Sequence, residues 1–275
     1  MIPVAFDYKL AESAEEAVGL LAEYGDDAKL LAGGHSLIPL MKYRLAAPSV
    51  LVDIGRVTDL SYVRDAGDEL HIGALTRHRD VEISDLVKTN AGLLAEATAH
   101  VGDPQVRHRG TIGGSIAHAD PASDLPAVLL ALRATLVATG PDGSREIPID
   151  GFYTGFLESV LADDELLTEI RVPKVPTAGW SFQKFNRRAQ DWAIVGVAAV
   201  HGDGVHGIGL VNMGSTPLRA AAAEAALASG APITDAAAVA DEGTEPTDDL
   251  NASSEFRRHL ARVLVGRALT EAAGR

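Results

Sequence analysis

The stretch KLLAGGHSL, residues 29–37, decides the fold of the first part of the chain. A short apolar strand is predicted over Lys29–Ala32, and it runs directly into Gly33 and Gly34. A helix over Pro39–Leu45 and a second strand over Val50–Ile54 are predicted to follow. This order predicts a strand–turn–helix–strand unit whose glycines lie where the first strand ends.

A second glycine pair occurs in GDPQVRHRGTIGGS, residues 102–115. Gly113 and Gly114 are predicted to form a turn before a helix, after a polar stretch over Gly102–Arg109. Paired glycines let a backbone approach a ligand closely, and successive amides can bind an anion. Two such loops suit a pyrophosphate that bridges two lobes. The same pairs also occur in ordinary tight turns, so the glycines alone leave both interpretations open.

Composition excludes several classes of protein. The 275 residues are 47% apolar and 23% charged, which is typical of a globular chain with a substantial core. Without cysteine there is no disulfide, thiolate nucleophile or cysteine-ligated iron–sulfur cluster. The net charge of −14 disfavours nucleic-acid binding. Neither a signal peptide nor a transmembrane segment of about 18 apolar residues is found, so a cytoplasmic location is expected.

The remaining elements indicate an α+β protein. Pro173–Thr177 is predicted to be a linker, and an acidic, solvated loop is predicted over Asp241–Asn251. Helices are expected over Glu15–Tyr24, Thr76–Ser84, Ala91–Val101 (capped by Asn90), Pro126–Leu132, Leu218–Ser229 and Ser254–Ala273. Further strands are expected over Glu69–Ala74, Ala134–Thr139, Leu166–Val172, Trp180–Phe185, Ala193–His201 and Gly207–Met213.

Most familiar catalytic and nucleotide motifs are absent. The sequence contains no P-loop, no H-E-x-x-H and no G-x-S-x-G, and Asn212 breaks the one candidate dinucleotide fingerprint. The histidine and aspartates of His118–Asp124 favour hydrogen bonding to a polar ligand over metal binding, so no metal site is predicted. Arg107–Arg109 and Arg187–Arg188 fit either solvated charge or contacts to an anion or a partner.

The two glycine segments together resemble the FAD-binding (medium) subunits of molybdenum hydroxylases. The similarity is greatest to the medium chains of aerobic carbon monoxide dehydrogenases, and the flavin domain of xanthine dehydrogenases is a more distant relative. It continues through 116–132, 165–173, 184–193, 214–220 and 256–268, and so covers nearly the whole chain.

The resemblance implies a two-lobed FAD-binding domain of the vanillyl-alcohol-oxidase/PCMH type over 1–176, with lobes of about 1–56 and 57–176. A smaller α+β domain over 177–275 follows. FAD would lie between the lobes, with Asp124 accepting hydrogen bonds from its hydroxyl groups, and with Lys184 and Trp192 near the ring. Family members commonly carry Asn where this chain has Ser115. The implied cofactor-binding residues are Leu30, Leu31, Ala32, Gly33, Gly34, His35, Ser36, Leu37, Gly102, Thr111, Ile112, Gly113, Gly114, Ser115, His118, Asp124, Leu167, Lys184 and Trp192.

The function implied by the resemblance is electron transfer, with no catalytic residue of the chain's own. Non-covalent FAD would accept electrons from 2Fe–2S clusters in a small subunit, while a large subunit holds the molybdenum cofactor. The complex would be a dimer of heterotrimers, cytoplasmic or peripheral at the inner face of the membrane. The substrate and the terminal acceptor stay open. The alternative is a free-standing FAD-dependent oxidase or dehydrogenase with its own substrate site.

Overall fold

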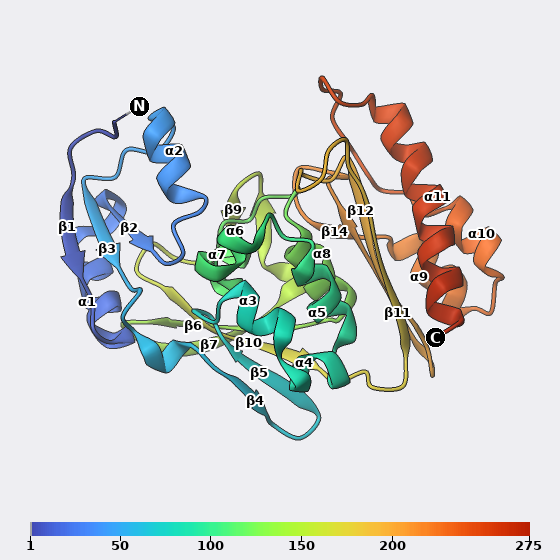
Figure 1. Ribbon diagram of the computed structural model, residues 1–275, viewed down its shortest axis with the longest axis horizontal. Coiled ribbons are helices and arrows are strands. Elements are labelled where there is room, and N and C mark those ends of the chain that lie inside the picture. Colours follow the sequence, from blue (N-terminus) through green and yellow to red (C-terminus); the bar gives the residue numbers. More distant parts are fainter. Residues whose placement is uncertain (1) are drawn as a thin grey trace.

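The computed structural model describes residues 2–275, and its strands form three main sheets that follow one another along the chain (Figure 1). The N-terminal sheet lies at one end, a five-stranded sheet lies in the middle, and a four-stranded sheet with the C-terminal helices lies at the other end. Helices and strands mix in each part, so the predicted α+β class is confirmed.

The N-terminal sheet is entirely parallel, in the order β1-β3-β2. Its elements are β1 (Asp7–Leu10), α1 (Ala14–Tyr24), β2 (Ala28–Leu31), α2 (Leu37–Tyr43) and β3 (Val50–Asp53). The Ser13 hydroxyl caps α1 by accepting a hydrogen bond from the Glu16 amide at 3.1 Å. Val18 and Leu21 of this helix pack on the buried face of the sheet. The strand–turn–helix–strand unit predicted around residues 29–37 is therefore present.

The middle sheet pairs its strands in an antiparallel manner, in the order β4-β5-β10-β6-β7. The strands are β4 (Val63–Asp65), β5 (Glu69–Gly73), β6 (Thr135–Gly140), β7 (Gly143–Pro148) and β10 (Leu166–Pro173). The helices of this region are α3 (His78–Ile83), α4 (Asp85–Asn90), α5 (Gly92–Ala99), α6 (Pro104–Arg109), α7 (Ile112–Ala117) and α8 (Asp124–Ala131), of which α4 and α7 contact the sheet directly. A small hairpin and three short 3-10 helices complete this region and its borders: β8 (Tyr153–Gly155), β9 (Glu158–Ser159), η1 (Gly25–Asp27), η2 (Thr58–Leu60) and η3 (Ile149–Gly151).

The C-terminal sheet is an antiparallel meander in the order β11-β12-β13-β14. Its elements are β11 (Gly179–Phe185), β12 (Val195–Gly202), β13 (Val205–Val211), β14 (Leu218–Arg219), α9 (Ala221–Ala228), α10 (Ile233–Ala238) and α11 (Ser254–Ala273). Helix α11 covers one face, and α8 of the middle region packs on the other (Figure 1). Ala198 and Val200 of β12 accordingly belong to the core of the middle region. The sheet is thus buried on both sides.

Several predicted elements differ from the structure. The polar stretch before Gly110 forms helix α6, because Asp103 caps it and Pro104 occupies its first turn. Asn90 does not cap the next helix: it is the last residue of α4, and its side-chain amide donates to the Leu86 carbonyl. The predicted helix over 218–229 begins only at Ala221, after the two residues of β14.

The acidic loop over 241–251 is anchored to α11 rather than fully solvated. The Asp241 carboxylate pairs with Arg262 at 2.6 Å, and Asp249 pairs with Arg257 at 2.7 Å. Arg257 is almost fully buried. A buried guanidinium without a partner is costly, so these carboxylates hold the loop against the helix.

Candidate cofactor site

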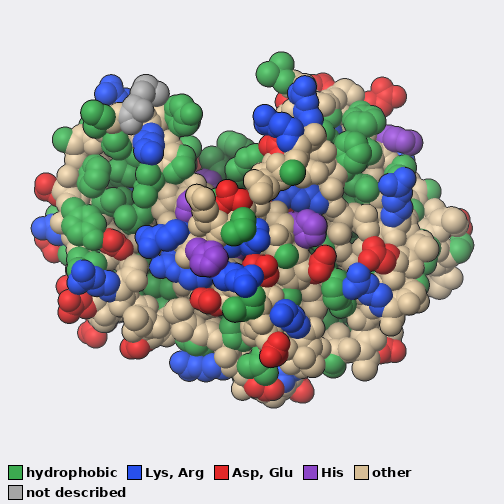
Figure 2. All heavy atoms as spheres, in the orientation of Figure 1, with side chains coloured by type: hydrophobic (Ala, Val, Ile, Leu, Met, Phe, Trp, Pro, Cys, Tyr) green, Lys and Arg blue, Asp and Glu red, His purple; other side chains and the backbone are tan. Residues whose placement is uncertain are grey.

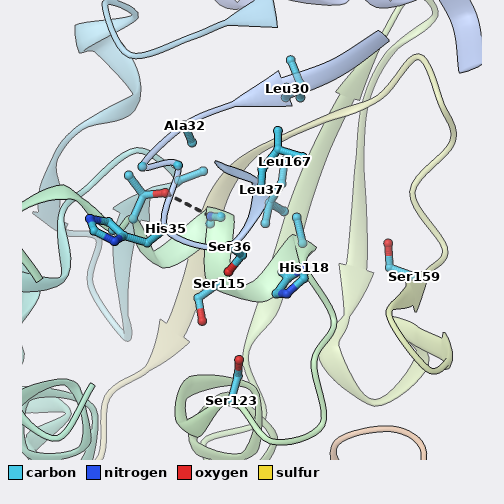
Figure 3. Close-up of a pocket in the computed structure, with 18 of the residues that line it drawn as sticks. Leu30, Ala32, His35, Ser36, Leu37, Ser115, His118, Ser123, Ser159 and Leu167 are labelled. Carbon is cyan, nitrogen blue, oxygen red and sulfur yellow. Dashed lines mark hydrogen bonds between the residues drawn. The ribbon is translucent and has the colours of Figure 1, made fainter. Parts of the chain in front are cut away.

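A cavity of about 850 Å³ lies between the N-terminal sheet and the middle region. Both glycine segments, the β8–β9 hairpin and the loop before β12 line it. The space-filling view is hollowed between the N-terminal lobe and the rest of the molecule, and the close-up shows side chains that line the cavity (Figures 2 and 3). The volume falls in the range of pockets that enclose cofactors, roughly 300–1,000 Å³.

The first glycine segment presents free backbone amides to this cavity. It connects β2 to α2, and Gly34 has a φ of 77°, a left-handed conformation that favours glycine. Within residues 2–275, no acceptor takes a hydrogen bond from the amides of residues 33–36. Gly33, Gly34 and Ser36 are half-buried, and His35 is exposed. Successive amides that have no acceptor in the protein and lie in the wall of a cavity are suited to bind an anionic ligand.

The second glycine segment uses its amides within the protein. Gly113 and Gly114 lie inside α7 rather than in a turn before it, and Thr111 caps this helix. The Gly113 amide donates to the Ala74 carbonyl at 2.8 Å, and the Gly114 amide donates to the Thr111 hydroxyl at 3.2 Å. The amides of Ile112 and Ser115 also have internal acceptors. The expectation that both segments offer free amides is wrong for this one.

The two segments are packed directly against each other. A Cβ added at Gly33 would lie 2.5 Å from the Arg109 carbonyl oxygen and 2.7 Å from the Gly110 Cα. Gly110 in turn rests on the His78 ring, where an added Cβ would lie 2.7 Å from Cδ2. His78 is buried and lines the cavity, and its Nδ1 has no partner among residues 2–275. Burial lowers the pKa of His78 to about 4, with smaller contributions from nearby positive charge.

An ion pair between Asp124 and Lys184 lies in the wall of the cavity. The Lys184 ammonium is 2.6 Å from Asp124 Oδ2 and also donates to the His100 carbonyl at 3.1 Å. Both side chains are buried, and the second oxygen, Oδ1, has no partner in the described chain. Burial raises the pKa of Asp124, and the charge of Lys184 partly offsets this. Oδ1 is therefore an acceptor that a hydroxyl or N–H donor in the cavity would satisfy.

Smaller polar side chains follow the cavity from α7 toward α8. Figure 3 shows Ser115, His118 and Ser123 among the side chains along this part. Burial lowers the pKa of His118, so its imidazole is neutral at neutral pH and can donate one hydrogen bond and accept another. Trp192 lies at the rim, where 57% of its surface is exposed.

The structure brings nearly all the predicted site residues to one place. Every one lines the cavity except Leu31, which faces a smaller hollow, and Ile112, which is fully buried in the core. Other residues that line the cavity were not predicted, because no motif in the sequence marks them. They include His78, Thr154, Leu157, Glu158, Ser159 and Gln190.

Two lobes, a run of free amides and a cavity between them are the features of a protein that holds a phosphate-bearing cofactor. Residues 4–175 match the family described as the FAD binding domain in molybdopterin dehydrogenase, and residues 180–272 match the CO dehydrogenase flavoprotein C-terminal domain. The chain belongs to this family of flavin-binding dehydrogenase subunits, as the two glycine segments predicted.

Its relatives are named as medium chains and subunits. The chain is 41% identical to the carbon monoxide dehydrogenase medium chain of Hydrogenophaga pseudoflava, over 99% of its own length and 98% of the relative. It is also 41% identical to the alpha subunit of the 6-hydroxypseudooxynicotine dehydrogenase complex of Paenarthrobacter nicotinovorans, over 99% and 96%. The putative xanthine dehydrogenase FAD-binding subunit of Escherichia coli is more distant, at 29% over 96% and 95%.

A solved structure of carbon monoxide dehydrogenase from Hydrogenophaga pseudoflava contains a chain that superimposes with a TM-score of 0.96 at 44% identity. The match covers 100% of this chain and 99% of that one. The predicted fold is confirmed, and the relatives support the subunit interpretation over a free-standing oxidase. The helices of residues 2–275 are each too short or too polar to cross a lipid bilayer.

Proposed function

We propose that this chain binds one FAD non-covalently and carries electrons from the 2Fe–2S clusters of a partner subunit to an external acceptor. The observation that carries the proposal is the run of free amides at residues 33–36, which face an 850 Å³ cavity in a member of an FAD-binding family. The pyrophosphate of FAD is negatively charged and needs hydrogen-bond donors. Backbone amides can supply them in this lobe, which has no phosphate-binding lysine motif.

The protein's own residues bind and orient the cofactor in this proposal. The amides of residues 33–36 hold the pyrophosphate, and Asp124 Oδ1 accepts a hydrogen bond from a cofactor hydroxyl. Lys184 is a positioning residue, since its ammonium fixes Asp124 Oδ2 at 2.6 Å and leaves Oδ1 turned to a ligand. The second glycine segment forms the opposite wall and supports the first through the contact of Gly33 with Arg109. The bound flavin would supply the redox chemistry.

The partners in this proposal are an iron–sulfur small subunit and a large subunit with the molybdenum cofactor. Two observations support it: the relatives are named as medium chains or complex subunits, and the chain has no cysteine for clusters of its own. The dimer of heterotrimers and the cytoplasmic location stay predictions. We also keep the division into 1–176 and 177–275, which agrees with the separate sheets on either side.

The cofactor part of the proposal is tested by releasing the flavin from the purified protein, prepared with any subunits that co-purify. We expect about one FAD per chain, left in the supernatant after acid precipitation. Flavin that stays with the precipitated protein would show a covalent bond, at His35 for example. FMN in place of FAD would contradict the pyrophosphate role of residues 33–36.

The electron-transfer part needs a separate experiment. Substrates of the large subunit should reduce the flavin under anaerobic conditions only when the cluster and molybdenum subunits are present. Robust turnover of such a substrate by this chain alone would contradict the subunit role and support an oxidase with its own substrate site.

A further inference from the structure

A second, smaller hollow of about 210 Å³ lies on the other side of the first glycine segment. Leu31, Ala32 and Gly33 form part of its wall, and Ala32 and Gly33 also line the large cavity. The remaining wall is charged: three arginines and one aspartate line the hollow, namely Arg56, Arg77, Arg109 and Asp53. None of the proposed contacts to FAD involves these charged side chains.

The three guanidinium groups have no acidic partner. Among residues 2–275, no carboxylate lies within salt-bridge distance of Arg56, Arg77 or Arg109. Asp53 forms no salt bridge with them; its Oδ2 accepts from the Tyr8 hydroxyl and its Oδ1 from the Gly55 amide, both at 2.7 Å, and its charge acts on Arg77 from a longer distance, as that of Asp80 does. Three positive charges and one negative charge leave an excess of two positive charges around the hollow.

This excess stands out against the rest of the molecule. The chain has a net charge of −14, and many of its other arginines are paired with carboxylates, as Arg145 is with Glu165 at 2.6 Å. Figure 2 shows Lys, Arg and His side chains gathered over α3 and α6, beside the N-terminal lobe. Arg77 precedes α3 and Arg109 ends α6. The local field here is opposite in sign to the overall charge, so it favours an anion.

The hollow is also partly pre-organised. Arg77 is half-buried, and its Nη1 donates to the Arg109 carbonyl, which fixes its guanidinium beside that loop. Burial and the neighbouring charge of Arg109 lower the pKa of Arg77. An anion between the two guanidinium groups would relieve this repulsion. Because one arginine is already held in place, less side-chain freedom is lost on binding.

We propose that this hollow binds a tetrahedral dianion of the phosphate class, either free phosphate or the phosphoryl group of a small molecule. Two excess positive charges match a dianion, and guanidinium groups donate pairs of hydrogen bonds to phosphate oxygens. A volume of 210 Å³ holds a phosphate with part of an attached group. The hollow shares Ala32 and Gly33 with the FAD cavity, but its charged side chains do not line that cavity, so the two proposals rest on different groups.

The test is equilibrium dialysis of the FAD-loaded protein against radiolabelled phosphate at low ionic strength. We expect one saturable site per chain, competed by sulfate and not by chloride at matched ionic strength. The double variant Arg56→Gln/Arg109→Gln should bind phosphate roughly 10–100-fold more weakly, since it loses charge-assisted hydrogen bonds. The matched control Arg267→Gln removes an exposed arginine of α11 and should bind as the wild type does.

The flavin content of each sample separates this proposal from the FAD proposal. All three proteins should carry equal FAD, because neither exchanged arginine side chain lies among the proposed FAD contacts. Competition by a nucleoside monophosphate would identify a phosphate monoester as the occupant, and competition by inorganic ions alone would identify free phosphate. No saturable binding, equal binding by the double variant, or binding that appears only after flavin removal would overturn the proposal. The last result would place the phosphate in the cofactor's pyrophosphate site.

Discussion

The segments Gly33–Ser36 and Gly113–Ser115 both carry a glycine pair beside the same cavity, but they use their backbone amides differently. The first segment leaves its amides without acceptors, whereas the second donates to Ala74 and Thr111. The first follows a parallel strand, and the second lies inside a short helix. The first is therefore suited to bind an anion, and the second to support the wall behind it.

A glycine pair beside a cavity can therefore have at least two structural causes. At Gly34 the cause is a positive φ, and at Gly113 it is the close approach of the Ala74 backbone. Neither glycine is required mainly because a ligand would collide with a Cβ. The two segments should consequently respond differently to substitution, in ligand affinity at the first and in stability at the second.

Gly34→Val should have the largest effect of the changes considered. A β-branched residue is strained at a φ of 77°, so the segment would rearrange and its amides would lose their alignment. Loss of about two charge-assisted hydrogen bonds predicts at least roughly 100-fold weaker FAD binding. Titration of flavin-stripped protein measures this. The control Gly230→Val creates the same strain at a φ of 85° with open space around the added Cβ, and it should bind FAD normally.

The buried His78 should make the junction between the two segments sensitive to acid. Its pKa is about 4 in the folded protein and about 6.5 in the unfolded chain, so the unfolded chain binds the extra proton between these values. The stabilisation that neutral, buried His78 gives to the folded protein is fully present above pH 6.5. It is lost as the pH falls toward 4, which lowers the free energy of unfolding by roughly 3 kcal/mol in total.

Urea unfolding of the wild type and of His78→Gln over this pH range measures the difference. The variant should lose less free energy of unfolding on acidification, because it carries no titrating group at this position. Parallel pH curves for the two proteins would show that His78 is not the group responsible.

Gly113→Ala should reduce stability more than affinity. The added Cβ would lie 2.5 Å from the Ala74 Cβ and 2.7 Å from its carbonyl oxygen, so one backbone must move, at a cost of roughly 1–3 kcal/mol. The folded fraction should still bind FAD within a few-fold of the wild type. As a control, Gly19→Ala in α1 meets no atom within 4 Å and should stabilise the protein slightly. A large loss of FAD affinity with unchanged stability would contradict the supporting role.

Gly114→Ala should have the smallest effect. Its Cβ would meet only the Thr111 hydroxyl, at 2.7 Å, and the Ala32 Cβ, at 3.8 Å, so the Thr111 side chain that caps α7 must shift, but no amide of residues 33–36 is disturbed. We expect FAD affinity within about threefold of the wild type in the same titration, a difference below 1 kcal/mol. A loss comparable to that of Gly34→Val would show that the second segment also contacts the cofactor directly.

Local sequence patterns predicted much of the fold. Helix α11 has both bounds as predicted, because Ser253 caps an amphipathic run. Helix α6 was not predicted, although Asp103 and Pro104 form a recognisable helix start. The polar composition of residues 102–109 was interpreted as a loop. The resemblance indicated which residues line the cavity, including Asp124 and Lys184.

What could not be predicted depends on contacts between distant residues. The amide of Gly113 donates to the carbonyl of Ala74, and four helices, α3 to α6, separate the two residues in sequence, so no local pattern shows that pairing. The ion pair of Asp124 with Lys184 likewise joins two regions that only the tertiary structure brings together. The three arginines that line the small hollow beside Gly33 are also brought together only by the tertiary structure.

The main proposal for this cavity is that the first glycine segment holds a pyrophosphate. It is tested most directly by the relative affinity of the flavin-stripped protein for FAD and FMN, measured by fluorescence titration on the wild type. FMN has the same ring system but lacks the pyrophosphate bridge and the adenosine. We expect FAD to bind at least roughly 100-fold more tightly than FMN, a difference of about 3 kcal/mol. Equal affinity for the two flavins would contradict it.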